Sequence, residues 1–228
     1  GGGLLLTALG WSWTAYAKKS VDFNPANQIG REFGMEVNDG SIFDPTDNIK
    51  GDPADPIFHQ FASHQVTAGI TKVGINVPSS LKLSRMARPV VWGDEDAWAQ
   101  AGEAILYPKG SHPPFAAVAE YGKGRVVYVA HDALFAASPH HRKEGWTEWL
   151  YMFDNLRFAM NIFGWLLKRH ITPLQTTITM PSTTMTREPA RRPPDLTLFT
   201  PNVSGLTVNI NGVTIPRTPN ATILRIRW

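Results

Sequence analysis

The chain has 228 residues, contains no cysteine and carries a formal net charge of +3 at pH 7. The lack of cysteine excludes disulfides, thiolate metal sites and a cysteine nucleophile. No stretch approaches the roughly 18 uncharged apolar residues of a membrane-spanning helix, so we expect no transmembrane segment.

The charge is spread unevenly along the chain. Residues 1–169 carry 16 Lys+Arg and 17 Asp+Glu, whereas residues 170–228 carry six Arg and two acidic residues. A basic tail suits anionic partners. Only Arg191 and Arg192 are adjacent, and no aromatic residues interleave with them. We therefore expect no nucleic-acid partner.

The first predicted elements are a strand and a helix. Residues 3–8 are short, apolar and entered through glycine, which is typical of a buried strand, and the turn GWSW follows them. Asn24 as a cap with Pro25 at the first helical position predicts a helix, and Gly34 suits its exit. The turn-rich residues 36–56, with repeated Asp-Pro pairs, predict a long surface loop.

A hairpin and a long helix follow in the middle of the chain. Strands are predicted near 69–76 and 89–92, while residues 97–108 fit a helix or a strand. Two β-rich runs, 115–120 and 125–130, flank the turn Tyr-Gly-Lys-Gly and predict a hairpin. Residues 145–168 predict a helix with a wide apolar stripe, made of Trp146, Trp149, Leu150, Phe153, Leu156, Met160, Phe163 and Leu167. Within it, Trp146, Trp149 and Phe153 fit either a face turned to the core or a sugar platform.

The end of the chain differs in composition from the body. Residues 171–195 are rich in Pro, Thr and Arg and predict an extended linker. Residues 196–228 contain three β-rich runs, and Asn211-Gly212 is a strong hairpin turn. These residues are either the start of a second β domain or a β extension that packs on something else.

The chain resembles the class I glutamine amidotransferase-like superfamily in the ordered series GGGLLLTALGWSW, NPANQIGREFGMEVNDG, HQVTAGI, PPFAAVAEYGKGRVVYVAHDALF and FDNLRFAMNIFGWLL. More narrowly, it is similar to ThuA-like domains and to the amidotransferase-like domain that precedes M60-type peptidase domains in TRPM8-channel-associated factors. The resemblance implies an α/β, flavodoxin-like three-layer sandwich with a mostly parallel sheet over residues 1–170. It also implies that residues 3–8 are the strand before the nucleophile elbow, and that the first one or two βα units are absent.

In that superfamily the elbow carries a cysteine, which this chain lacks, so glutamine hydrolysis by that mechanism is excluded. Ser12 is the only hydroxyl in GWSW, but a serine elbow reads Gly-x-Ser-x-Gly and here Trp13 follows. Ser12 is therefore either a nucleophile or the cap of the next turn, with Trp11 and Trp13 packed over the sheet edge.

The resemblance places a histidine after a late strand, at the position of His131. In the superfamily the acidic residue lies two positions after this histidine. Here Asp132 follows His131 directly. His131 and Asp132 are thus candidates for catalysis, for a ligand pocket with Trp11, Ser12 and Trp13, or for a structural pair. A metal site is a weaker hypothesis, with His131, His140 and His141 as its ligands.

Two acidic runs have the oxygen density of cation sites. Residues 93–98 read GDEDAW and residues 44–52 read DPTDNIKGD. Neither has the spacing of an EF-hand, and the first fits an ordinary helix start.

Two functions follow from these residues. The first is a non-catalytic scaffold or binding module within a larger protein or assembly. Its partners would be other protein subunits or further domains of the same protein, and residues 196–228 would contact them. The alternative is a carbohydrate-related ThuA-like enzyme or sugar-binding domain that uses a pocket near His131 and Asp132. A channel-regulator role rests on the resemblance alone. We expect no cofactor. The residues do not indicate a cellular compartment. Glycosylation at the sequons Asn202 and Asn220 depends on that compartment.

Overall fold

The computed structural model describes residues 1–136, 149–168, 177–179, 207–210 and 213–215. The chain divides into two units, Gly1–Ile171 and Thr172–Trp228. The predicted division into a domain at 1–170, a linker at 171–195 and a β segment at 196–228 stays a prediction.

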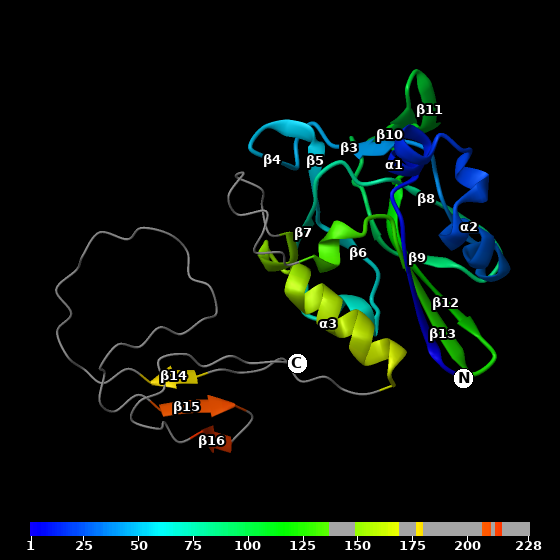
Figure 1. Cartoon of the computed structure of the whole chain (residues 1–228). Helices are drawn as coiled ribbons and strands as arrows, with labels where there is room; N and C mark the ends of the chain where they lie inside the picture. Colours follow the sequence, from blue (N-terminus) through cyan, green and yellow to red (C-terminus); the bar gives the residue numbers. More distant parts are fainter. Residues whose placement is uncertain (137–148, 169–176, 180–206, 211–212, 216–228) are drawn as a thin grey trace. The chain divides into compact units, whose positions relative to one another are not determined.

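A five-stranded sheet forms the centre of the first unit (Figure 1). Its order is β1-β13-β12-β9-β6, with bounds β1 Gly3–Thr7, β13 Gly124–Val129, β12 Pro114–Tyr121, β9 Arg88–Trp92 and β6 Gln60–Phe61. β1 runs parallel to β13, and the other pairs are antiparallel. The predicted strand at 3–8, the predicted hairpin at 115–130 and the predicted strand at 89–92 are confirmed.

Three smaller antiparallel sheets complete the unit. They are β2 Met35–Val37 with β8 Leu81–Leu83; β11 Ala104–Tyr107, β10 Trp98–Ala101 and β3 Ser41–Phe43; and β4 Asn48–Ile49, β5 Asp52–Phe58 and β7 Val73–Gly74. The predicted surface loop at 36–56 is wrong, because it contains strands β3 and β4 and part of β2 and β5, and Ile42 is fully buried. The ambiguous residues 97–108 form the hairpin of β10 and β11.

The helices are short. They are α1 Gly10–Ser12, α2 Pro25–Gly30 and α3 Asn155–Leu166, with a π-helical turn at Trp13–Ala17 and 3-10 turns at Val21–Phe23, Arg31–Phe33, Gln65–Thr67, Ala133–Phe135 and Trp149–Tyr151. The side chain of Asn24 accepts a hydrogen bond from the Ala26 amide at 2.9 Å, and Pro25 opens α2. Gly34 has a φ of +77°, which glycine adopts without strain. The predicted start and exit of this segment are confirmed.

The long helix is shorter than predicted. Of the expected residues 145–168, those up to 148 lie outside the described part of the chain, and α3 begins only at Asn155. Asn155 is fully buried, and its side chain fixes this start. The side-chain nitrogen donates to the carbonyls of Gly74 (2.7 Å) and Trp149 (2.7 Å), and the side-chain oxygen accepts from the Gly74 backbone amide (3.2 Å).

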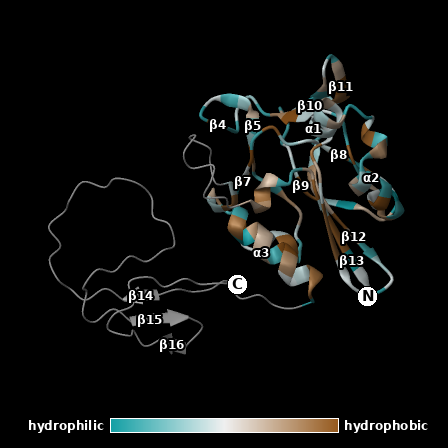
Figure 2. Cartoon of the chain, in the orientation of Figure 1, coloured by the Kyte–Doolittle hydropathy of each residue, from teal (hydrophilic) through white to brown (hydrophobic). Residues whose placement is uncertain are grey.

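The helices α2 and α3 pack on opposite faces of β13 (Figure 1). The Tyr128 hydroxyl donates to Asn27 of α2 at 3.0 Å, whereas the Arg125 guanidinium lies over the Trp165 ring of α3 at 5.2 Å. Odd and even residues of a strand point to opposite faces, which explains this arrangement. Figure 2 shows that β12 and β13, which lie between the helices, are largely hydrophobic.

The predicted fold class is wrong. A mostly parallel three-layer sandwich was expected, but β1–β13 is the only parallel pair among the described strands, and the helices are three short segments. The physical reason lies in the connections. A tight turn such as 121–124 can only join antiparallel strands, whereas each parallel pair needs a crossover of a dozen or more residues.

The second unit contains one small antiparallel sheet, made of β14 Thr177–Thr179, β15 Thr207–Ile210 and β16 Val213–Ile215. β15 and β16 pair with Ile210 opposite Val213, as the predicted Asn211-Gly212 hairpin requires. The other predicted β-rich runs of the tail lie outside the described residues.

Candidate functional site

The turn after β1 lies beside the end of β13, because parallel strands end at the same sheet edge. Its backbone is held by residues 77–79. The Gly10 amide donates to Ser79 Oγ at 3.0 Å, and the Trp11 indole N–H donates to the Val77 carbonyl at 2.9 Å. A Cβ on Gly10 would lie 1.8 Å from the Asn38 carbonyl oxygen, so only glycine fits. The backbone of Gly10 therefore packs directly against that of Asn38.

Ser12 lies in this turn without a base. Its side chain is half-exposed, it makes no side-chain cap to the following turn, and no hydrogen bond in the described part of the chain involves its hydroxyl. The neighbouring Trp13 donates its indole N–H to the Ser20 carbonyl at 3.1 Å. Both tryptophans of GWSW are thus held by backbone carbonyls, and the geometry favours a packing role for them.

His131 is almost fully buried, at 3% exposure, and it is neutral at pH 7. Burial lowers its pKa to about 4, and this effect outweighs the opposite influence of Asp132 and of the Asn76 backbone. The Ala133 amide donates to His131 Nδ1 at 2.9 Å, so Nδ1 carries no proton and the hydrogen is assigned to Nε2.

Asp132 does not orient His131 as a catalytic acid would. A catalytic histidine donates its ring N–H to the acid. Here His131 Nδ1 and Asp132 Oδ1 both accept from the Ala133 amide, each at 2.9 Å, and the two acceptors lie 3.5 Å apart. This arrangement caps the 3-10 turn Ala133–Phe135. It favours the structural interpretation of the pair.

A cavity of about 510 Å³ lies next to the turn. The residues that line it include Trp11, Asp39, Phe43, Val77 and Gln100. Of the five predicted pocket residues only Trp11 lines it; Ser12, Trp13, His131 and Asp132 do not. The structure therefore does not bring the predicted residues together around this cavity.

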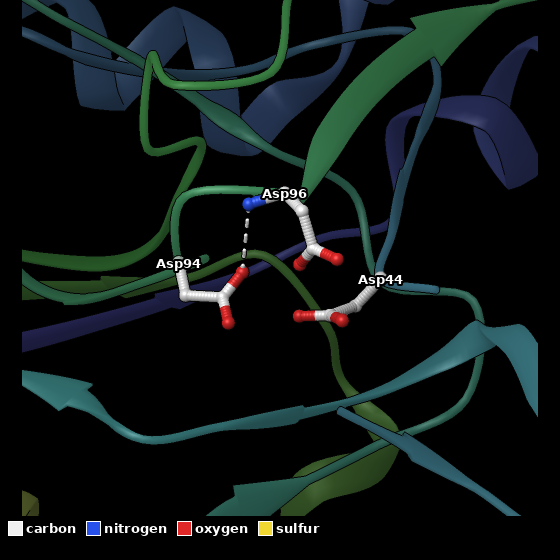
Figure 3. Close-up of side chains that lie close together, drawn as sticks. All are labelled: Asp44, Asp94 and Asp96. Atoms are coloured by element: carbon white, nitrogen blue, oxygen red, sulfur yellow. Dashed lines mark hydrogen bonds between the residues drawn. The ribbon is translucent and has the colours of Figure 1, made fainter. Parts of the chain in front are cut away.

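Three aspartates form an acidic cluster that the sequence did not reveal as one group (Figure 3). One carboxylate oxygen from each of Asp44, Asp94 and Asp96 lies within 4.8 Å of the others. Asp44 is 2% exposed, and its burial, followed by the charges of Asp94 and Asp96, raises its pKa. The two acidic runs at 44–52 and 93–98 were visible separately, but nothing in the sequence indicated that β3 and β10 pair and bring them together.

The cluster has the oxygen ligands that Mg²⁺ or Ca²⁺ would use, but all three side chains already accept hydrogen bonds, Asp96 from the Thr46 hydroxyl at 3.2 Å. Asp44 accepts from the amides of Thr46 (3.0 Å) and Asp47 (2.7 Å). Asp94 accepts from the amides of Asp96 and Ala97, each at 3.2 Å. Both carboxylates therefore stabilise tight turns. Of the predicted metal ligands, His140 and His141 lie outside the described residues, and His131 has its Nδ1 already engaged.

The outer face of α3 is apolar. Four side chains form this face, which we call the outer stripe: Leu156 (44% exposed), Met160 (partly exposed), Phe163 (41%) and Leu167 (61%). The opposite face of the helix carries the buried residues Phe158, Ala159, Ile162, Trp165 and Leu166. Figure 2 shows hydrophobic residues along α3. Of the eight residues of the predicted stripe, these four lie together on α3, and they face solvent.

None of the helices in the described ranges is long and apolar enough to cross a membrane.

No protein-family model and no curated protein sequence matches the chain. Among solved structures, the chain is similar to the mmIFT52 N-terminal domain, with a TM-score of 0.52 and 14% identity over 75% of this chain and 68% of that one. It is also similar to the cytoplasmic protein STM1381 from Salmonella typhimurium LT2, with a TM-score of 0.41 and 16% identity over 73% of this chain and 56% of that one. The first of these likenesses shows a related fold, and at this identity it shows the fold alone.

Proposed function

We propose that this chain is a non-catalytic module that binds another protein molecule through the outer stripe of α3. The observation that carries the proposal is that α3 is apolar on both its inner and its outer face. A surface helix of a monomer normally presents mainly polar residues to water. In α3 the polar side chains Arg157 and Asn161 occupy only one flank, and the outer stripe beside them is apolar. Contiguous exposed apolar patches mark interaction sites.

The energetics of the outer stripe suit a binding surface. Full burial of a leucine or phenylalanine side chain stabilises by about 1.5–3 kcal/mol. Leu156, Phe163 and Leu167 leave roughly half of that gain unused, because they are 41–61% exposed. A partner that covers them gains a few kcal/mol before the costs of association.

The sheet edge that carries the predicted site residues supports the non-catalytic part of the proposal. The sequence has no cysteine, the Ser12 hydroxyl has no hydrogen-bonded base among the described residues, and His131 uses Nδ1 to accept a backbone amide. These groups can hold the turn in place. They do not form the hydrogen-bonded series that acyl transfer needs, in which a nucleophile contacts a general base and a third group orients that base.

A sugar-binding role remains a second candidate, and the cavity beside Trp11 favours it. The Trp11 indole is held by its bond to Val77, while Asp39 and Gln100 supply polar groups. This cavity differs from the predicted pocket around His131 and Asp132. Membership of the amidotransferase-like superfamily and partner contacts through residues 196–228 are likewise part of the proposal.

The mass of the native particle tests the proposal. We expect native mass spectrometry of the particle isolated from its source to give a mass above that of one chain. The double variant Leu156→Glu/Phe163→Glu is expected to lose the additional mass, since two charges cannot be buried in an apolar contact. A matched control, Tyr16→Glu/Ile105→Glu, changes two other exposed apolar residues and is expected to keep it. A wild-type particle of one chain, or a particle that both double variants leave intact, would overturn the proposal.

A further inference from the structure

We infer that the cavity beside Trp11 is a binding site for a small organic cation, a molecule that carries an amino or quaternary ammonium group. The cavity has a volume of about 510 Å³, which falls within the range of small-molecule sites. The inference goes beyond the proposed function and does not depend on it, because no residue of the outer stripe lines this cavity.

The charge of the cavity is negative. Asp39 is the only charged residue among the described residues that line it. Asp39 is half-buried, and within the described part of the chain its carboxylate takes part in no hydrogen bond or ion pair. The acidic cluster adds further negative charge nearby, since Asp44 directly follows the lining residue Phe43. A cleft lined by charge of one sign attracts ligands of the opposite sign, so the cavity favours a cation over an anion or a neutral sugar.

The aromatic lining suits the same ligand. Trp11 and Phe43 both line the cavity, and an ammonium group is attracted to the face of an aromatic ring. The structure contains one such contact next to the cavity. Phe43 stacks on Trp98 with the ring centroids 5.3 Å apart, and the Lys109 ammonium lies over the Trp98 ring at 5.1 Å. Aromatic rings beside a carboxylate therefore distinguish an ammonium group from an uncharged group of the same shape.

Gln100 supplies a hydrogen-bond donor close to Asp39. Its side-chain oxygen accepts from the Trp98 indole at 2.8 Å, which leaves the side-chain nitrogen to donate. A Cβ on Gly40 would lie 2.4 Å from the Gln100 carbonyl oxygen, so the backbone next to Asp39 packs directly on Gln100. This donor suits an oxygen acceptor on the ligand. We therefore expect an ammonium group and a hydroxyl or carbonyl oxygen in the same small molecule, as in choline.

The backbone at Val77 is strained beside this cavity. Val77 has a φ of +41°, which is rare for a β-branched residue. Its amide donates to the Ala54 carbonyl at 2.7 Å, and its carbonyl accepts from the Trp11 indole at 2.9 Å. Backbone strain that is held by tertiary contacts clusters at ligand sites. The strained conformation at Val77 holds Trp11 in place and is an independent sign of a binding site.

A pair of matched probes tests the inference. Choline and 3,3-dimethylbutan-1-ol have the same shape, but a carbon atom replaces the charged nitrogen in the second. In isothermal titration calorimetry of the full chain at constant ionic strength, we expect choline to bind in the millimolar range and its uncharged analogue about tenfold more weakly. Ethanolamine serves as the primary-amine probe. Tighter binding of either ammonium compound than of the analogue supports the inference and shows which kind of ammonium group the site prefers.

Two variants connect this binding to the cavity. Asp39→Asn keeps the shape of the side chain and removes the charge, so we expect it to weaken choline binding about tenfold and to leave the analogue unchanged. Phe43→Leu is expected to reduce the preference for choline over the analogue. Glu32→Gln, which removes an exposed charge from a residue that does not line the cavity, is the matched control and is expected to bind choline as the wild type does. Leu156→Glu/Phe163→Glu is expected to do the same.

Four results would overturn the inference. They are equal affinity for choline and its uncharged analogue, equal effects of Asp39→Asn and Glu32→Gln, and no binding of either ammonium compound. The fourth is tighter binding of glucose than of choline, which would assign the cavity to a neutral sugar. All four leave the proposed role of the outer stripe untouched, because that role is measured by the mass of the native particle.

Discussion

At the residue scale, His131 shows how burial decides the chemistry of a side chain. Its position at the end of β13 suited a ligand site in the sequence, and the adjacent Asp132 suggested a charged pair. In the structure burial dominates, the pKa of His131 falls to about 4, and the ring accepts a backbone hydrogen bond at Nδ1. A neutral, engaged imidazole stabilises the loop.

This burial predicts a loss of stability in mild acid. Above pH 6.5 the histidine is neutral in both states. As the pH falls below 6.5 the unfolded chain takes up a proton, but the folded chain does not until about pH 4, so the free energy of unfolding decreases. Between pH 7 and pH 5 we expect a decrease of about 2 kcal/mol from this group.

Urea unfolding of the wild type and of His131→Gln at both pH values measures this decrease. Glutamine keeps an acceptor and a donor but does not titrate, so the variant is expected to lack about 2 kcal/mol of the change. The pKa of His64 is also lowered by burial, and its contribution is common to both proteins. Equal pH dependence in the two proteins would show that His131 is not buried in its neutral form.

The aspartate cluster gives a second prediction for single residues. Repulsion from Asp94 and Asp96 contributes to the raised pKa of Asp44. Asp96→Asn keeps the acceptor for the Thr46 hydroxyl (3.2 Å) and removes one charge. We expect it to stabilise the fold by about 0.5 kcal/mol at pH 7, measured by urea unfolding.

Glu103→Gln, which removes an exposed charge outside the cluster, is the control for net charge. A melting temperature that rises with millimolar calcium in the wild type but not in Asp96→Asn would contradict the repulsive role, because a bound cation would then hold the carboxylates together.

At the element scale, Asn155 determines where α3 begins, and we expect Asn155→Ala to be strongly destabilising. The change leaves the amide and carbonyl of Gly74 and the carbonyl of Trp149 without their partners in a buried site. The expected loss is about 2–4 kcal/mol of unfolding free energy. Urea unfolding beside Asn161→Ala, whose side chain also bonds backbone carbonyls but at the surface, measures it. Equal small losses would show that Asn155 does not position the helix.

Local signals in the sequence predicted several elements well. Asn24, Pro25 and Gly34 act within their own turns, and the hairpin turn at 121–124 joins neighbouring strands, so each is decided by adjacent residues. Strands β2 and β3 were missed because their partners are distant in the sequence; β3 pairs with β10, more than 50 residues away. Strands β4 and β5 pair with each other, but they lie in the stretch whose Asp-Pro and Gly-Asp-Pro residues predicted a loop. The stripe of α3 was found, but its direction was not, since both faces of the helix are apolar.

At the scale of the whole molecule, the family resemblance led to the wrong sheet. It implied mostly parallel strands, whereas the described strands are antiparallel except for β1 and β13. That one parallel pair still brings the GWSW turn and His131 to the same edge, as expected. The acidic cluster could not be foreseen, because it depends on a pairing between two acidic loops that no local pattern encodes.

The most direct test of the central claim is hydroxyl-radical footprinting of the native particle against the purified, dissociated chain. We expect Met160, Phe163 and Leu167 to be oxidised more slowly in the particle, because a partner covers the outer stripe. Met86 and Tyr16, which are exposed outside the stripe at 38% and 78%, are expected to react equally in both samples. Equal oxidation of Met160 and Phe163 in particle and chain would contradict the claim that α3 is the binding surface.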